Sequence, residues 1–138
     1  MTYAAKVVHP GDRFVQAMPS ITTIQLVKYA GASDDYNRIH YDLTYATEAG
    51  LGGVIAHGML TMGFMSSALV AWAGPRAQIK HLAVRFTAPV RPGDVVEVTG
   101  AVTATRLTDG HNDAQCDVVA RVGERVVAQG EATVRFPE

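Results

Sequence analysis

Two short segments contain the residue types that acid–base chemistry requires. Asp35 and His40 lie five positions apart in Asp-Tyr-Asn-Arg-Ile-His, and His57-Gly58 begins an uncharged apolar stretch seventeen residues after His40. Carboxylate and imidazole are common general acid–base groups, each typically worth about 10² to 10⁴ in rate. The backbone N–H of Gly58, at a helix N-terminus, would stabilise negative charge on an oxygen atom. These residues predict proton-transfer catalysis beside an anion-stabilising helix end.

The addition of water to a double bond conjugated with a carbonyl needs such a set of groups. One group activates the water, one handles the proton of the α-carbon, and one stabilises charge on the carbonyl oxygen. Asp35 and His40 are candidates for the first two roles, and Gly58 is a candidate for the third because glycine lets a ligand approach the backbone closely. The pattern alone leaves another interpretation open, in which Asp35 and Asn37 hydrogen-bond to their own backbone in a turn.

Length and composition are typical of a small enzyme subunit. The 138 residues predict one domain, and a formal net charge of −1 provides no basic surface for nucleic acid. The N-terminus lacks the apolar core of a signal peptide, and serine, threonine and glycine dilute the apolar stretch of residues 57–75, which is shorter than the about 20 residues of a membrane span. Cys116 is the only cysteine, which excludes a disulfide within the chain. We expect its side chain to be a small buried apolar group, and we expect a cytoplasmic protein.

Helical patterns flank the candidate catalytic loop. Thr22 and Gln25 fit a capping box at the start of a short helix, which we expect to end at Gly31. Residues 43–50 can form another one or two helical turns. A long helix is predicted from about His57 to Ala73, and its nearly continuous apolar surface is typical of a helix surrounded by protein.

After Pro75 the apolar residues alternate, which predicts strands. Turns are predicted at residues 92–94, 109–113 and 123–124. The predicted strands are residues 82–88, 95–105, 114–122 and 125–136. Four strands in an antiparallel meander after one long buried helix give an α+β fold in which the sheet wraps the helix.

Residues 29–66 resemble the MaoC-like, (R)-specific enoyl-CoA hydratase and dehydratase family, whose signature reads roughly G-D-x-N-P-[LIV]-H. The matching residues are Asp-Tyr-Asn-Arg-Ile-His from Asp35 and Ala-His-Gly-Met from Ala56. Residues 85–94, Arg-Phe-Thr-Ala-Pro-Val-Arg-Pro-Gly-Asp, also resemble a strand and turn of that family, so the similarity spans most of the chain. It implies a single hot-dog domain over residues 1–138, with an additional N-terminal strand near residues 11–18.

The resemblance also implies roles for individual residues. The catalytic aspartate and histidine of the family correspond to Asp35 and His40, and the asparagine that helps to hold the site corresponds to Asn37. The glycine of the oxyanion hole corresponds to Gly58. The family's substrate is an acyl-CoA thioester, and the reaction needs no metal, nucleotide or flavin.

Four residues are expected to contact the substrate: Asn37, His57, Ser66 and Arg85. Ser66 corresponds to a serine that some family members have further along the helix. His57 lies beside the helix start, where a structural hydrogen bond is an alternative role. Arg85 is one of four basic residues that could bind the CoA phosphates, the others being Arg76, Lys80 and Arg91, although such side chains on a sheet rim also serve simply as solvated charges. No metal role is expected for His9, His81 or His111, which have no nearby cysteine or histidine in the sequence.

Two positions depart from the family signature. Asp34 replaces the glycine before the catalytic aspartate, and Arg38 replaces the proline after the asparagine. Loss of proline frees φ at position 38, which predicts a less rigid loop. Asp34 places a second carboxylate beside Asp35, and like charges close together can raise the pKa of one of them.

The sequence therefore predicts a hydro-lyase that adds water reversibly to a trans-2-enoyl thioester of CoA or of acyl carrier protein, giving an (R)-3-hydroxyacyl thioester. A sheet wrapped on one helix leaves open edges, so we expect a homodimer or a higher homo-oligomer, with no nucleic-acid or membrane partner. Two alternatives stay open. One is a hot-dog acyl-CoA thioesterase, and the other is a non-catalytic subunit of a heteromeric dehydratase.

Overall fold

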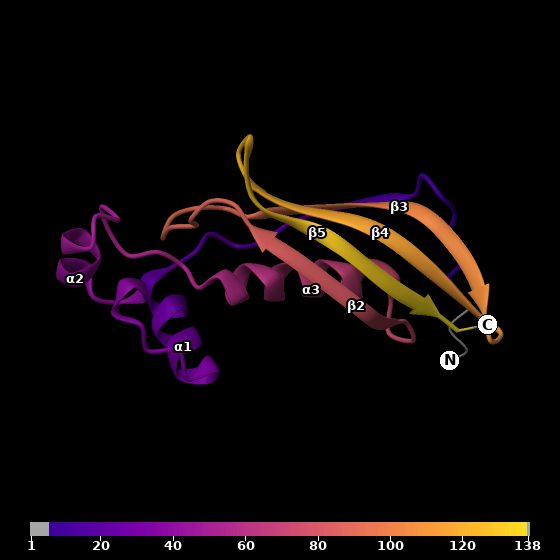
Figure 1. The fold of residues 1–138 in the computed structure, drawn as a ribbon, viewed down its shortest axis with the longest axis horizontal. Coiled ribbons are helices and arrows are strands. Elements are labelled where there is room, and N and C mark those ends of the chain that lie inside the picture. Colours follow the sequence, from indigo (N-terminus) through magenta and orange to yellow (C-terminus); the bar gives the residue numbers. More distant parts are fainter. Residues whose placement is uncertain (1–5, 138) are drawn as a thin grey trace.

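The structure, a computed structural model, describes residues 6–137 (Figure 1). The helical elements are α1 (Thr23–Ser33), the 3₁₀ helix η1 (Arg38–His40), α2 (Leu43–Glu48) and α3 (Gly58–Ala73). The strands are β1 (Arg13–Ala17), β2 (Gln78–Phe86), β3 (Glu97–Thr108), β4 (His111–Val122) and β5 (Arg125–Phe136). These bounds confirm the predicted long helix, the predicted short helix after residue 42 and the predicted N-terminal strand.

The strands form one antiparallel sheet in the order β1-β3-β4-β5-β2. The sheet curves over α3, whereas α1 and α2 lie beyond one end of it (Figure 1). The α+β arrangement of a sheet wrapped on one long helix is confirmed. The predicted meander of four strands is wrong, because β2 pairs with β5 at the far edge and not with β3. Two-residue turns force β3, β4 and β5 to be neighbours, whereas the longer connection of residues 87–96 lets the chain cross from one side of the sheet to the other.

The core lies between α3 and the inner face of the sheet. Inward residues of the central strands, such as Val98, Val118 and Val134, are fully buried together with Met65 and Leu69 of α3. Burial of each such side chain contributes about 1.5 to 3 kcal/mol. Cys116 is part of this core as predicted, and burial raises the pKa of its thiol to about 11.

Helix α3 is not covered on all sides within one protomer. Met59 and Val70 are 57% and 53% exposed, although the sequence pattern predicted a helix surrounded by protein. The helix is apolar all round, but the sheet covers only part of its circumference. Among the described residues, no helix has the length and apolar content needed to cross a bilayer.

The predicted bounds of two strands are wrong, because β2 is Gln78–Phe86 and not 82–88, and β3 is Glu97–Thr108 and not 95–105. Two further boundaries are wrong for local reasons. The second turn is limited to Asp109 and Gly110, whose φ values of 49° and 75° fit a tight hairpin of the primed type, so residues 111–113 belong to β4. Helix α1 begins as predicted, because the Thr22 side chain accepts a hydrogen bond from the Gln25 N–H at 3.1 Å. It continues past Gly31, however, and ends at Asp34, which takes the left-handed conformation with φ 57°.

Candidate active site

The end of α1 places Asp35. Asp34 turns the chain in a left-handed conformation, and the Ser33 hydroxyl accepts a hydrogen bond from the Asp35 N–H at 3.3 Å while donating to the Tyr29 carbonyl at 2.7 Å. A left-handed residue after a helix is usually glycine, and aspartate is one of the few others that adopt it readily. Asp34 therefore occupies a backbone conformation that the glycine of the family signature would also adopt readily.

Two consecutive turns continue the loop, and each is closed by a hydrogen bond from a backbone N–H to a side-chain oxygen. The Asp35 carboxylate accepts a hydrogen bond from the Asn37 N–H through Oδ1 at 3.2 Å. The Asn37 side chain then caps η1 by accepting from the Ile39 N–H at 3.2 Å. The turn interpretation of Asp35 and Asn37 is thus correct, and it is compatible with catalysis, because Oδ2 of Asp35 makes no hydrogen bond in these turns and the side chain is 52% exposed.

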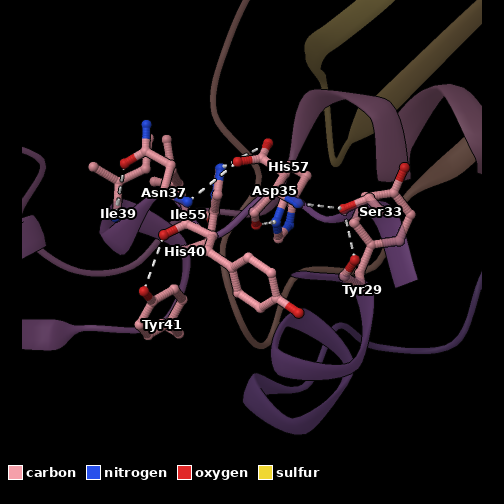
Figure 2. A network of polar contacts seen from close by, with 10 residues as sticks. Tyr29, Ser33, Asp35, Asn37, Ile39, His40, Tyr41, Ile55 and His57 are labelled. Atoms are coloured by element: carbon pink, nitrogen blue, oxygen red, sulfur yellow. Dashed lines mark hydrogen bonds and ion pairs between the residues drawn. The ribbon is translucent and has the colours of Figure 1, made fainter. Parts of the chain in front are cut away.

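His40 is buried and points one ring nitrogen toward Asp35. Its Nδ1 lies 2.7 Å from the carbonyl oxygen of Ile55 (Figure 2). A carbonyl only accepts hydrogen bonds, so Nδ1 carries the proton, and Nε2 of the neutral ring is an acceptor. That Nε2 lies 3.8 Å from Oδ2 of Asp35.

The segment before α3 joins the catalytic loop to the helix start. The Ile55 N–H donates to the Ile39 carbonyl at 3.1 Å, and the Ala56 N–H donates to the Val90 carbonyl at 2.7 Å. The Arg91 guanidinium also donates to the Leu51 carbonyl at 2.6 Å. These bonds bring the first turn of α3 beside η1.

His57 fills the space behind both catalytic candidates. Its ring is 2% exposed and stacks on the His40 ring with 3.6 Å between centroids and 21° between planes. Its Nε2 donates to the Asp35 carbonyl at 3.2 Å, and the Tyr29 ring meets it edge-on at 4.8 Å (Figure 2). Burial lowers the pKa of His57 more than the hydrogen bond to the Asp35 carbonyl raises it, and this net lowering favours the neutral ring.

Gly58 is the first residue of α3. The side chain of the N-cap residue His57 makes no capping hydrogen bond, which leaves the first helical N–H groups to other acceptors. A Cβ atom at Gly58 would lie 3.1 Å from the Phe86 ring, closer than most real contacts. Glycine therefore lets Phe86 pack directly against the positive end of the helix dipole.

The structure brings some predicted site residues together and separates others. Asp35, His40 and His57 form one cluster, with Gly58 adjoining it in the chain. Ser66 lies eight residues along α3 from Gly58, about 12 Å at the helical rise. Arg85 lies opposite Gln129 on the outward face of the sheet, where Asp117 and Glu131 line the same shallow hollow.

Sequence reasoning missed three groups that shape the site: the Ile55 carbonyl, the Tyr29 ring and the Phe86 ring. A backbone carbonyl has no signal in residue type, and Tyr29 and Phe86 are ordinary members of a helix and a strand pattern. Only the packing of α1, β2 and α3 reveals them.

The second departure from the signature also has a local explanation. The Arg38 guanidinium pairs with Asp42 at 2.7 Å and lies over the Tyr45 ring at 4.5 Å. Hydrogen bonds from the Tyr45 N–H and from Arg38 lower the pKa of the Asp42 carboxyl. Side-chain contacts thus hold η1 and α2 together where proline would restrict the backbone.

A metal ion fits this cluster poorly. Asp35, His40 and His57 can each offer a ligand atom, and these atoms lie within 4.8 Å of one another. The Nε2 of His57 is already bonded to the Asp35 carbonyl, however, and the two imidazole rings are stacked nearly parallel. Imidazole lone pairs lie in the ring plane, so those of two stacked rings do not converge on one ion. The arrangement suits acid–base chemistry better.

The chain is similar to known proteins over most of its length. Residues 5–128 match the family model described as MaoC like domain. The chain is 37% identical to an (R)-specific enoyl-CoA hydratase of Rhodospirillum rubrum, over 86% of this chain and 81% of that protein. It is 35% identical to a 3-hydroxybutyryl-CoA dehydratase of Methylorubrum extorquens, over 86% of this chain and 74% of that protein.

A solved structure confirms the predicted hot-dog fold. The unliganded R-hydratase of Pseudomonas aeruginosa superposes with a TM-score of 0.82 and 30% identity, over 95% of this chain and 83% of the other. Sequence similarity and fold thus agree over most of the length. The chain belongs to the MaoC-like dehydratase family.

Proposed function

We propose that the protein catalyses the reversible hydration of trans-2-enoyl-CoA to (R)-3-hydroxyacyl-CoA, with Asp35 and His40 as the acid–base pair and Gly58 as the oxyanion donor. Membership of this family makes the chain a hydratase or dehydratase. The observation that carries the proposed roles is the 3.8 Å between Oδ2 of Asp35 and Nε2 of His40.

That separation suits a shared water molecule better than a direct hydrogen bond. A direct N–H···O bond has a length of about 2.7 to 3.2 Å, whereas one water can contact two polar atoms that are 3.8 Å apart. Both atoms are acceptors when His40 is neutral and Asp35 is ionised. Both protons of the water molecule then point at the pair, and its oxygen lone pairs are free to attack a carbon atom.

The first turn of α3 supplies the third function. Attack of water at the β-carbon of the enoyl group moves negative charge to the thioester oxygen. The Gly58 N–H, at the positive end of a 16-residue helix, is a donor for that oxygen. Glycine adds no side chain of its own beside this N–H, and the space that a Cβ would need lies 3.1 Å from the Phe86 ring.

The reaction balances with these groups alone. A C–O bond forms at the β-carbon, the carbon–carbon π bond and one O–H bond of water break, and the pair takes up the released proton. A proton returns from the pair to the α-carbon, which regenerates the starting protonation states. Because Asp35 and His40 face each other directly, the acid and base roles are assigned to the pair and not to either residue alone.

The other predicted substrate contacts have different support. The Asn37 side chain is engaged in capping η1, which favours a role in holding the loop. Contacts of Ser66 and Arg85 with substrate stay predictions, as do the choice between CoA and acyl carrier protein and the length of the acyl group. A single domain over residues 1–138 and a cytoplasmic location also stay predictions.

The exposed surfaces support self-association of the chain. Within the described residues, β1 and β2 each pair on one side only, and the α3 side chains Met59 and Val70 are more than half exposed. Open strand edges and an apolar helix face are surfaces that a second copy can cover. We infer a homo-oligomer, either the homodimer or the higher homo-oligomer that the sequence predicts.

To test the proposal, we would incubate crotonyl-CoA with the purified wild-type protein. Three quantities are measured: the loss of conjugated enoyl absorbance, the release of free thiol and the configuration of the product. We expect loss of absorbance without thiol release, an (R) product, and full activity of the control Asp34→Asn. Release of thiol would instead identify a thioesterase. Activity that appears only with a second hot-dog chain would identify a heteromeric subunit, and failure with longer, branched and ring-bearing enoyl-CoAs as well would contradict the proposal.

A further inference from the structure

We propose that His57 is a positioning residue, which joins the Asp35 backbone and the His40 ring to the first turn of α3, so that the acid–base pair and the oxyanion donor are held as one unit. This inference rests on the proposed function of that site. It replaces the expected contact of His57 with substrate, because a ring that is 2% exposed has little surface to offer a ligand.

The first contact fixes the backbone of the catalytic aspartate. The Asp35 carbonyl can only accept, so Nε2 of His57 carries a proton and donates it at 3.2 Å. Asp35 otherwise lies in an exposed loop, where its N–H donates to the Ser33 hydroxyl and its carboxylate accepts from the Asn37 N–H. The bond from His57 is a long-range restraint that ties the Asp35 backbone to another element, the start of α3.

The second contact fixes the plane of the catalytic imidazole. The hydrogen bond from Nδ1 to the Ile55 carbonyl holds one edge of the His40 ring, and the stacked His57 ring holds its face at 3.6 Å. An edge and a face together determine where Nε2 points (Figure 2). The Tyr29 ring, edge-on at 4.8 Å, supports His57 from α1.

The cost of this arrangement argues against a purely structural role. With Nε2 donating, Nδ1 of His57 is an acceptor, and it is buried without a hydrogen-bond partner among the described residues. Burying an unpaired acceptor is unfavourable, and a phenyl ring would fill the same space without it. Removal of that acceptor offsets the loss of the Nε2–H bond to the Asp35 carbonyl, which lies in an exposed loop, so stability alone does not require histidine at position 57.

Two variants separate the two contacts. His57→Phe keeps an aromatic face for His40 and loses the donor, whereas His57→Gln keeps an amide donor and loses the ring. For each variant we would measure kcat and KM for crotonyl-CoA, the midpoint of thermal unfolding, and the ¹⁵N spectrum of the imidazoles, which reports each tautomer without turnover.

We expect His57→Phe to unfold at the same or a higher temperature while its kcat falls by about 10-fold to 100-fold with little change in KM, as expected when a reacting group is misplaced by about an ångström. We expect His57→Gln to unfold at a lower temperature, to lose kcat similarly, and to show a mixture of His40 tautomers. A mere packing residue would not lower kcat in the stable variant.

Two results would overturn the inference. One is wild-type kcat in both variants, and the other is a wild-type spectrum in which His57 carries its proton on Nδ1. The spectrum of the wild type can be measured without a folded variant and without enzymatic turnover. If the wild type fails to hydrate any enoyl-CoA, the proposed function is wrong, and the spectrum still decides whether His57 and His40 adopt the inferred tautomers.

Discussion

Nε2 of His40 lies 3.8 Å from Oδ2 of Asp35, while the opposite nitrogen of the same ring is held at 2.7 Å by a backbone carbonyl. The carbonyl selects the tautomer, and the tautomer presents a basic nitrogen to the carboxylate. The pair therefore needs no rearrangement before it can bind a water molecule between its two acceptor atoms.

Gly58→Ala tests the oxyanion donor. The added methyl group would lie 3.1 Å from the Phe86 ring and would crowd the approach to the helix N-terminus, so we expect kcat for crotonyl-CoA to fall by about 10² or more. Gly31→Ala is the matched control, because its methyl group would meet only the Tyr36 hydroxyl at 4.0 Å inside α1. The control should gain about 0.5 to 1 kcal/mol in stability and keep its activity. Equal activity of the two variants would contradict the role of Gly58.

Asp34 should act on stability and not on chemistry. Its φ of 57° is costly for residues with a Cβ, so the free energy of unfolding should fall in the order glycine, aspartate, alanine at this position. Steps of about 0.5 to 1 kcal/mol are expected in denaturant melts of Asp34→Gly and Asp34→Ala. Hydration activity should change little, and a large loss in Asp34→Gly would show that the carboxylate itself takes part in the reaction.

The Asp113–Arg135 pair predicts a pH dependence of stability. Arg135 donates two hydrogen bonds to the Asp113 carboxylate, at 2.7 and 2.8 Å, and these bonds lower the pKa of that carboxyl below its ordinary value of 3.8. A lowered folded-state pKa means that the stabilisation is present above about pH 4 and is lost as the pH falls through the folded value. Asp113→Asn should cost about 1 to 3 kcal/mol at pH 7.

The comparison is made by chemical denaturation of wild type and Asp113→Asn at several pH values. The difference in free energy of unfolding should shrink as the pH falls below about 4, because the unfolded wild type then takes up a proton at Asp113, and it should be smallest below the lowered folded-state pKa, where the side chain is neutral in both states. A difference that is constant from pH 7 to pH 3 would show that packing, and not the charge of Asp113, carries the effect.

Much of the fold could be predicted because local chemistry decided it. Thr22 was recognisable as an N-cap, and the apolar run after His57 matched α3. The end of α1 was mispredicted at Gly31 because glycine is the usual stop, whereas the left-handed residue is Asp34. The place of β2 beside β5 could not be predicted, since strand order depends on how the chain crosses the sheet and not on alternation within a strand.

The sequence could predict candidate residues for the site but not their geometry. Spacing and family resemblance proposed Asp35, His40 and Gly58, whose catalytic roles stay predictions, and the tautomer of His40 depends on a carbonyl fifteen residues away. His57 was expected at the substrate, and its burial behind His40 became visible only when α1, η1 and α3 were packed together. Residue types reveal which chemistry is available, and tertiary contacts decide which atoms can perform it.

The central claim is that Asp35 and His40 act as one unit, and the most direct test is kcat for crotonyl-CoA hydration by Asp35→Asn, His40→Gln and the double variant. Each single change should lower kcat by about 10² to 10⁴ with the fold retained, and the double variant should be no worse than the poorer single one, because a pair that shares one water fails when either member is lost. Losses that multiply in the double variant, or a single variant with wild-type kcat, would contradict the account.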